Sequence, residues 1–308
     1  IAVAPPSANE SFALCVGMPS AGKSSLLNAY LSPNKDENPK PTAALEYMFA
    51  RRATTANTPK DMAHIWELGG GQHVSDLVAV PITVANFQSA LYMVVLDLSR
   101  PSDIIEQLTH WTDQIKVRAA RAAHYPTCSQ VAAHLMSRPA TTCRRSTYSK
   151  FGKDHPDLRL VKPCPVPLLI VANKYDKFKD EDGVKRKVVG QALRFVAHMN
   201  GASLIYCSTK EKQLKDIFRV QLNRFLFKSS GKKMMETNPE RALVVPAGAD
   251  RFEDILKTTP GNTVASDFVA GNSISEEAMN LWKKHIENFF GPPTLSLELM
   301  AGQGEGKE

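Results

Sequence analysis

The chain has 308 residues, 43% of them hydrophobic and 22% charged, which is typical of a globular protein with a substantial core. Its apolar runs are shorter than the roughly 20 residues that a membrane-spanning helix needs, so membrane insertion is not expected. The formal net charge is +7, and nine basic and two acidic residues between Arg118 and Lys162 account for all of it. Nucleic acid is not an expected partner, because such a local basic insert has few aromatic residues. A solvated loop or a contact site for an acidic protein partner is the preferred interpretation.

The five cysteines show no spacing typical of a metal site. Two of them fall within predicted core strands, which favours buried thiols in a reducing cytosolic compartment over a disulfide framework. The five are Cys15, Cys128, Cys143, Cys164 and Cys207.

The first predicted element is a short buried strand over 12–16. A loop of sequence Gly-Met-Pro-Ser-Ala-Gly-Lys-Ser follows it and matches the phosphate-binding pattern G-x-x-x-x-G-K-[ST]. A predicted helix begins after the loop, so backbone N–H groups and the partial positive charge of a helix N-terminus would face phosphate oxygens. We expect Lys23 to reach the β- and γ-phosphates and the Ser24 hydroxyl to bind Mg²⁺. The predicted phosphate-binding residues are Gly17, Ser20, Ala21, Gly22, Lys23, Ser24 and Ser25.

Strand and helix patterns alternate along the rest of the chain. Strands are predicted over 45–51, 62–68, 91–97, 166–172 and 202–207, and helices over 102–120, 184–199 and 212–227. Each connection looks long enough for a crossover. The predicted fold class is therefore α/β, a Ras-like P-loop GTPase fold with a mostly parallel sheet and helices on both faces. Every nucleotide motif falls at the carboxyl end of a predicted strand, where such sheets bind ligands.

A domain organisation follows from these elements. We expect an N-terminal segment over 1–10, a Ras-like domain over 11–227 with the basic insert at 118–165, and a C-terminal extension over 228–308. The extension contains an amphipathic pattern over 275–290, with Ser275 as a plausible N-cap and Gly-Pro-Pro after the last turn. This helix is expected either to pack on its own domain or to lie in a groove of a partner.

The sequence Asn-Lys-Tyr-Asp over 173–176 directly follows a predicted buried strand and matches the N-K-x-D element of GTPases. The Asp176 carboxylate is expected to accept hydrogen bonds from guanine N1–H and the exocyclic amine, a pair of donors that adenine lacks. Ser-Thr-Lys over 208–210 resembles the S-A-K element that supports the base. The predicted base-binding residues are Asn173, Lys174, Asp176, Ser208, Thr209 and Lys210.

Two positions depart from active small GTPases. Glu67 stands where D-x-x-G would have its aspartate, and Gln72 lies one residue later than the glutamine that orients the attacking water. Thr42 resembles the switch threonine that closes on Mg²⁺. We expect GTP or GDP with Mg²⁺ as the cofactor, held by Ser24, Thr42 and, through a water, Glu67. No catalytic residue is assigned, and slow or absent hydrolysis is expected.

Several longer strings are more specific than the nucleotide motifs. They are Lys40–Tyr47, Asn57–Asp61, His64–Gly71, Lys153–Asp157, Pro165–Pro167, Leu193–His198, Gly201–Leu204 and Leu281–Lys284. Together they resemble the dynein light intermediate chain family, over nearly the whole chain from about residue 12 to about residue 293. The Glu-Leu-Gly-Gly-Gly ending of the third string most resembles the cytoplasmic dynein-2 branch.

The resemblance implies a non-motor subunit that binds and stabilises the tail of the dynein-2 heavy chain. Implied partners are other dynein-2 subunits and the intraflagellar transport train. The implied locations are the cytoplasm and the cilium or flagellum, including its axoneme and basal body. Two alternatives stay open: an active GTP-hydrolysing switch in signalling or trafficking, and, less favoured, a basic nucleic-acid-binding P-loop protein.

Overall fold

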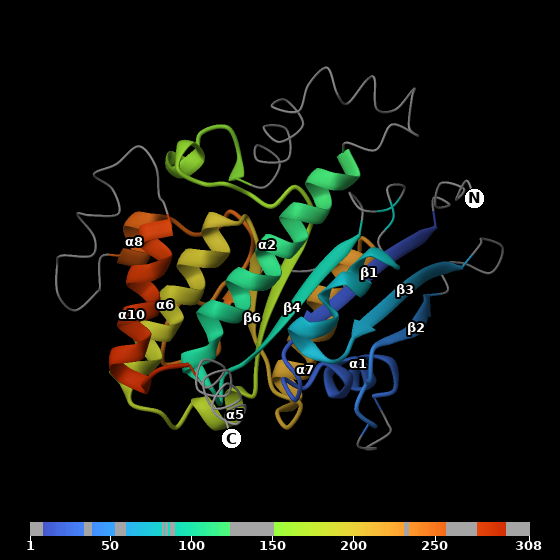
Figure 1. The fold of residues 1–308 in the computed structure, drawn as a ribbon, viewed down its shortest axis with the longest axis horizontal. Helices are drawn as coiled ribbons and strands as arrows, with labels where there is room; N and C mark the ends of the chain where they lie inside the picture. The colour runs from blue at the N-terminus through green and yellow to red at the C-terminus, as the bar shows by residue number, and fades with distance from the viewer. Residues whose placement is uncertain are drawn as a thin grey trace, which may run out of the picture.

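The computed structural model describes residues 9–33, 39–52, 60–81, 83, 86, 90–123, 151–230, 234–256 and 276–293. Most of the predicted N-terminal segment and residues 124–150 of the predicted basic insert lie outside these ranges. Strands of the described chain form a single sheet with helices on both of its faces (Figure 1). The predicted α/β class is confirmed.

The sheet has seven strands in the order β2-β3-β1-β4-β5-β6-β7. Their bounds are β1 (Glu10–Gly17), β2 (Leu45–Arg52), β3 (Asp61–Leu68), β4 (Leu91–Asp97), β5 (Leu168–Asn173), β6 (Ser203–Tyr206) and β7 (Val244–Val245). The central pairs are parallel, whereas β2 pairs antiparallel with β3 and β7 antiparallel with β6. The expectation of a crossover in every connection is therefore wrong for β2 and β3, which only residues 53–60 separate.

Two layers of helices cover the sheet, with α2 in front of the strands and α7 behind them in Figure 1. One layer contains α1 (Lys23–Leu31) and α7 (Lys212–Leu226). The other contains α2 (Ile104–Ala123), α6 (Gly183–Met199), α8 (Phe252–Leu256) and α10 (Glu276–Phe290). Four short helices complete the described elements: η1 (Gly71–Ala79), η2 (Pro101–Asp103), η3 (Pro156–Arg159) and α5 (Tyr175–Phe178).

Strand alternation divides the apolar side chains between these two layers. In β1, Leu14 and Val16 pack with the α2 and α6 layer, while Ala13 and Cys15 pack with the α1 and α7 layer. Every residue of β4 and β5 is buried, because the neighbouring strands and both helix layers surround them. Cys15, Cys164 and Cys207 are buried and form no disulfide with one another, as expected for the two that the sequence places in core strands. The other two cysteines lie outside the described residues.

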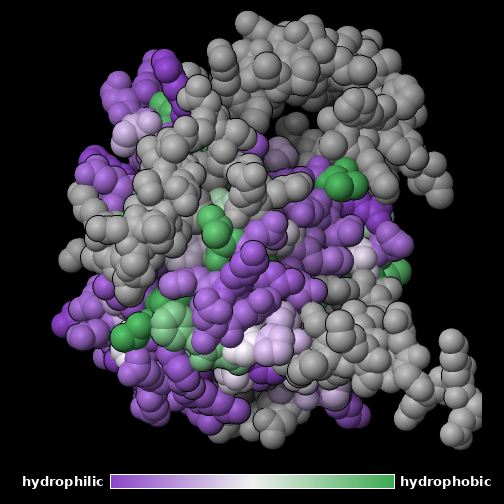
Figure 2. All heavy atoms as spheres, turned by 60° about the vertical axis from the view of Figure 1, so that its left-hand side comes forward, coloured by the Kyte–Doolittle hydropathy of each residue, from purple (hydrophilic) through white to green (hydrophobic). Residues whose placement is uncertain are grey.

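Helix α10 packs on its own domain. Ala278, Trp282 and Ile286 are buried, and the Trp282 ring lies 5.9 Å from that of Phe195 on α6. The helix ends at Gly291, whose φ of 82° falls in the left-handed region that glycine favours. Figure 2, turned to bring this side forward, shows a largely hydrophilic described surface with small separate apolar groups. Of the two interpretations of the amphipathic pattern, packing on the same domain is therefore the one that the structure supports.

Within the described chain, no helix combines the length and the apolar character that crossing a membrane would require.

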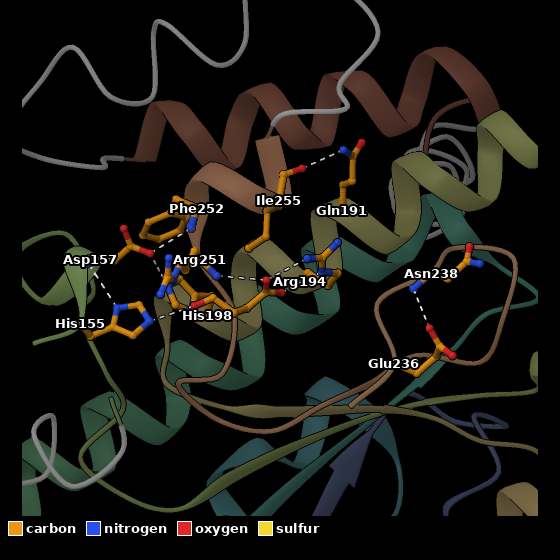
Figure 3. Close-up of polar contacts among 11 residues, drawn as sticks. His155, Asp157, Gln191, Arg194, His198, Glu236, Asn238, Arg251, Phe252 and Ile255 are labelled. Carbon is orange, nitrogen blue, oxygen red and sulfur yellow. Dashed lines mark hydrogen bonds and ion pairs between the residues drawn. The ribbon is translucent and has the colours of Figure 1, made fainter. Parts of the chain in front are cut away.

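A buried polar cluster joins η3, α6 and the segment before α8 (Figure 3). One oxygen of Asp157, Oδ2, lies 2.8 Å from Nε2 of His198 and accepts from the backbone N–H of Phe252 at 2.9 Å. His155 accepts at Nδ1 from the Asp157 N–H at 3.2 Å, and its Nε2 donates to the carbonyl of Asp250 at 3.0 Å. We call Asp157, His155, His198 and Asp250 the polar clasp.

An arginine on α6 extends the polar clasp. Arg194 donates from Nε and from a terminal nitrogen to the two carboxylate oxygens of Asp250, at 2.7 and 2.8 Å. The ligand atoms of His155, Asp157 and His198 all lie within 4.8 Å of one another, a separation that could suit a metal ion. Both ring nitrogens of His155 are already hydrogen-bonded, however, so we interpret the group as a structural clasp.

Candidate nucleotide-binding site

The predicted phosphate loop lies between the end of β1 and the start of α1. Its backbone passes through the left-handed region at Ser20, with φ of 62°, and at Gly22, with φ of 88°. A Cβ at Gly22 would lie 2.4 Å from the side-chain nitrogen of Asn173, and one at Gly17 would lie 2.2 Å from the carbonyl oxygen of Val95. Both glycines are therefore required by close approach as well as by backbone angle.

Among the residues that the structure describes, no side chain caps the N-terminus of α1. Its N-cap, Gly22, has no side chain that could accept from the first turn. The first N–H groups of a helix have no intrahelical partner, and they carry the positive end of the helix dipole. Ser24 and Ser25 lie in this first turn.

Lys23 is buried beneath the loop, with only 5% of its surface exposed. Its Nζ donates to the carbonyl oxygens of Gly17 at 3.0 Å and Met18 at 2.8 Å. An ammonium has three donors, so one remains for a phosphate oxygen. Burial lowers the pKa of Lys23, and the nearby Glu67 opposes this shift. The two carbonyls thus orient the Lys23 ammonium group, whose charged form is disfavoured by burial.

Glu67, at the end of β3, meets the phosphate loop directly. The Ser24 hydroxyl donates to Glu67 Oε1 at 2.7 Å. Burial raises the pKa of the Glu67 carboxyl, while the hydrogen bond from Ser24 and the charge of Lys23 oppose the rise. Glu67 Oε2 is buried and has no hydrogen-bond partner among the described residues. A bare carboxylate oxygen beside a serine hydroxyl is a donor set that Mg²⁺ prefers, so these residues fit that ion.

The three predicted magnesium residues line one pocket of about 590 Å³. It lies between α1 and the chain leading into β2, and its lining comprises Ser24, Asn28, Pro39, Lys40, Pro41, Thr42, Ala43, Ala44, Leu45, Glu46, Met48 and Glu67. The Thr42 hydroxyl donates to the exposed carboxylate of Glu46 at 2.8 Å. Thr42 is therefore near the other two residues, but its hydroxyl is hydrogen-bonded elsewhere.

The triple glycine after β3 joins the Thr42 segment to the phosphate loop. The Gly69 N–H donates to the Ala44 carbonyl at 2.7 Å, and a Cβ on Gly69 would lie 1.9 Å from the Thr42 carbonyl oxygen. A Cβ on Gly71 would lie 2.8 Å from the Pro19 ring. These glycines permit close packing, a role that the sequence pattern alone does not reveal. The side chain of Gln72 lies outside the described residues.

The predicted base-binding elements meet at the carboxyl ends of β5 and β6. Asn173 Nδ2 donates to the carbonyl of Ala21 at 2.8 Å, which ties the N-K-x-D element to the phosphate loop. Asp176 lies in the first turn of α5, where its Oδ1 accepts from the Ser208 hydroxyl at 2.6 Å. Its Oδ2 lies 3.2 Å from the Lys210 ammonium. The structure thus brings the two separate sequence motifs together on one carboxylate.

The charge state of Asp176 suits base recognition. Burial alone would raise its pKa, but hydrogen bonds from Ser208 and Lys210 outweigh burial and hold the pKa below its ordinary value. The carboxylate is therefore ionised at neutral pH, and it is a strong acceptor for two N–H donors. Thr209 is half-buried between these two partners in the chain.

Asp97, at the end of β4, is a site residue that the sequence analysis missed. Its Oδ2 lies 2.5 Å from the Lys174 ammonium, and its Oδ1 accepts from the N–H and hydroxyl of Ser99 at 2.9 and 2.6 Å. Asp97 is also the strand partner of Asn173. The available signal was a carboxylate at the carboxyl end of a buried strand. This contact sets the position of Lys174, whose stem is predicted to pack along the base.

A phosphate loop, a serine–glutamate pair and an N-K-x-D carboxylate, in this order on a mostly parallel sheet, define a Ras-like P-loop protein. Consistently, residues 13–131 match the family model described as Roc, Ras of Complex, domain of DAPkinase.

Whole-chain similarity specifies the family. The chain is 39% identical over 275 residues to cytoplasmic dynein 2 light intermediate chain 1 of Danio rerio, covering 89% of this chain and 73% of the relative. The human protein of that name is 36% identical over 287 residues, covering 93% and 78%. The crystal structure of the dynein light intermediate chain's conserved domain is similar with a TM-score of 0.61 at 17% identity, over 89% of this chain and 97% of that one. This chain belongs to the cytoplasmic dynein 2 light intermediate chain family.

Proposed function

We propose that this chain is a non-catalytic subunit of cytoplasmic dynein 2 that binds and stabilises the heavy chain tail. With other dynein-2 subunits and the intraflagellar transport train, it serves retrograde transport in cilia and flagella, and it is found in the cytoplasm and the cilium. The observation that carries the proposal is the similarity to light intermediate chains of dynein 2 over about nine tenths of the chain.

The experiment that tests this role is co-expression with the dynein-2 heavy chain tail. We expect the two chains to copurify, and the tail to be recovered in larger soluble amounts than when it is expressed alone. A small GTPase of the same fold is the matched control and should not copurify. Absence of any association under low-salt conditions would refute the subunit role.

We further propose that the site holds GTP or GDP with Mg²⁺ and turns it over slowly or not at all. Ser24 and Glu67 would hold the ion, with Thr42 close by, and Mg²⁺ would neutralise charge on the β- and γ-phosphates. The uncapped start of α1 and the third donor of Lys23 support phosphate binding. The ionised carboxylate of Asp176 supports guanine selectivity.

Lys23→Ala separates a structural nucleotide site from an active switch. We expect this variant to lose nucleotide binding while it retains the heavy chain tail. The parent should hydrolyse labelled GTP no faster than roughly 10⁻³ s⁻¹, the scale of an unassisted Ras protein. Faster turnover that Lys23→Ala abolishes would establish the alternative, an active GTP-hydrolysing switch.

A further inference from the structure

The edge strand β2 has an open side. It is the terminal strand of the sheet, and β3 is its only partner among the strands that the structure describes. Its eight residues include no proline, glycine or lysine. Natural edge strands usually carry proline, charged side chains (lysine above all) or a bulge, which discourage another strand from pairing with their free N–H and C=O groups. β2 pairs with β3 in continuous register without a bulge, and its charged residues are Glu46, Arg51 and Arg52.

Aromatic side chains line one face of this edge. Tyr47 and Phe49 are 44% and 50% exposed. The Tyr47 ring lies 4.9 Å from that of Trp66 on β3, and His64 stacks on Phe12 of β1 at 5.0 Å. We call these five residues the aromatic margin. Figure 1 shows β2 at the margin of the sheet, away from α2, and η1 packs on β1 and β3.

The charge beside the aromatic margin is positive at one end. The Arg51 guanidinium lies 5.0 Å from the centre of the Phe49 ring. Lys60, just before β3, is exposed at the same end of the hairpin. The carboxylate of Asp61 lies 3.9 Å from a different arginine, Arg52. A carboxylate on an added segment could therefore pair with Arg51.

We propose that β2 receives an extended segment of the dynein heavy chain tail as an additional strand. Alternate apolar side chains of that segment would pack on the aromatic margin, and an acidic residue would face Arg51. We propose an extended segment because a strand can form hydrogen bonds with the backbone N–H and C=O groups along the edge of β2. A helix would contact only the side chains. The inference rests on the proposed function and identifies the surface that performs it.

The direct test uses the full chain with Tyr47→Ser and Phe49→Ser together. Affinity for the purified heavy chain tail should fall at least about tenfold, since buried aromatic anchors dominate interface energies. Arg51→Glu should also weaken binding, most strongly at low salt. The control is the double variant Val184→Ser with Val220→Ser. These side chains are 46% and 40% exposed and lie on helices α6 and α7 rather than on β2. The control should bind like the parent, and thermal melting should show that all variants are folded.

Amide hydrogen exchange reports whether the contact is a strand. We expect exchange over 45–52 to slow in the complex, because the open edge would become hydrogen-bonded. Unchanged exchange there would overturn strand addition, even if the aromatic variants bind less. Equal binding by parent and aromatic variants would overturn the inference and leave the proposed function standing. A parent that fails to bind the tail at all would overturn both.

Discussion

Asp176 shows how single side chains prepare this site. Its carboxylate is held between the Ser208 hydroxyl at 2.6 Å and the Lys210 ammonium at 3.2 Å. Both contacts stabilise the charged form, which is the form that would accept hydrogen bonds from a bound guanine. Asn173 fixes the same element to the phosphate loop through its bond to Ala21. The base end and the phosphate end of the site are thus coupled by one side-chain amide.

Replacing Asp176 by alanine should therefore change selectivity more than general affinity. Two charge-assisted hydrogen bonds would be lost, each worth about 1.5–3 kcal/mol, so GTP binding should weaken by roughly 100-fold or more. ATP binding should change little, because adenine lacks those donors. Titration calorimetry with both nucleotides measures the two affinities. If the parent protein binds ATP and GTP equally, the guanine interpretation is wrong.

Among the elements, η3 and the segment before α8 are joined to α6 by the polar clasp rather than by apolar contact alone. Burial by itself would raise the pKa of Asp157, but bonds from His198 and the Phe252 N–H hold it below the ordinary value of 3.8. A lowered carboxyl pKa means that protonation favours the unfolded chain. The contribution to stability is complete above the unfolded pKa and is lost as pH falls through the folded pKa.

The free energy of unfolding should therefore fall on acidification below pH 3.8, and the Asp157→Asn variant should show a flatter dependence in this range. Urea unfolding at several pH values measures this difference. Asp154→Asn, at an exposed position three residues earlier, is the control and should follow the parent. If the free energy of unfolding of the parent and of Asp157→Asn depended on pH in parallel, the charge of the Asp157 carboxylate would not contribute to stability.

Helix α10 gives the second prediction at this scale. Trp282 is 1% exposed and packs near Phe195, so Trp282→Ala should lower the free energy of unfolding by about 3–5 kcal/mol. The neighbouring Leu281 is 37% exposed, and Leu281→Ala should cost much less. Equal effects of the two variants in chemical unfolding would contradict the packing of this helix.

For the whole molecule, the sequence predicts the centre of the sheet better than its edges. The continuous apolar runs of β4 and β5 predict burial on both faces, and periodicity predicts α6 and α7 nearly to their ends. Strand β7 is too short, at two residues, for any periodic signal. The direction of β2 depends on pairing with β3, which local patterning does not encode.

The sequence likewise predicts some features of the candidate site and not others. Motif spacing predicts the phosphate loop and the N-K-x-D carboxylate, because these interactions depend on residues close in sequence. The pairs Asp97–Lys174 and Ser24–Glu67 join residues far apart in sequence. The Asp97–Lys174 contact was not predicted, and Ser24 and Glu67 were predicted to share Mg²⁺ but not to be hydrogen-bonded to each other. The clasp residues His155, Asp157 and His198 lie within strings that resemble the family, but the strings alone did not indicate that they meet.

The most direct test of the whole account is the structure of this chain within an assembled dynein-2 complex. We predict a guanine nucleotide with Mg²⁺ between Lys23 and Asp176, and a heavy chain segment paired along β2. If this chain made no contact with the heavy chain tail, and no nucleotide density were present between Lys23 and Asp176, both the subunit role and the nucleotide site would be contradicted.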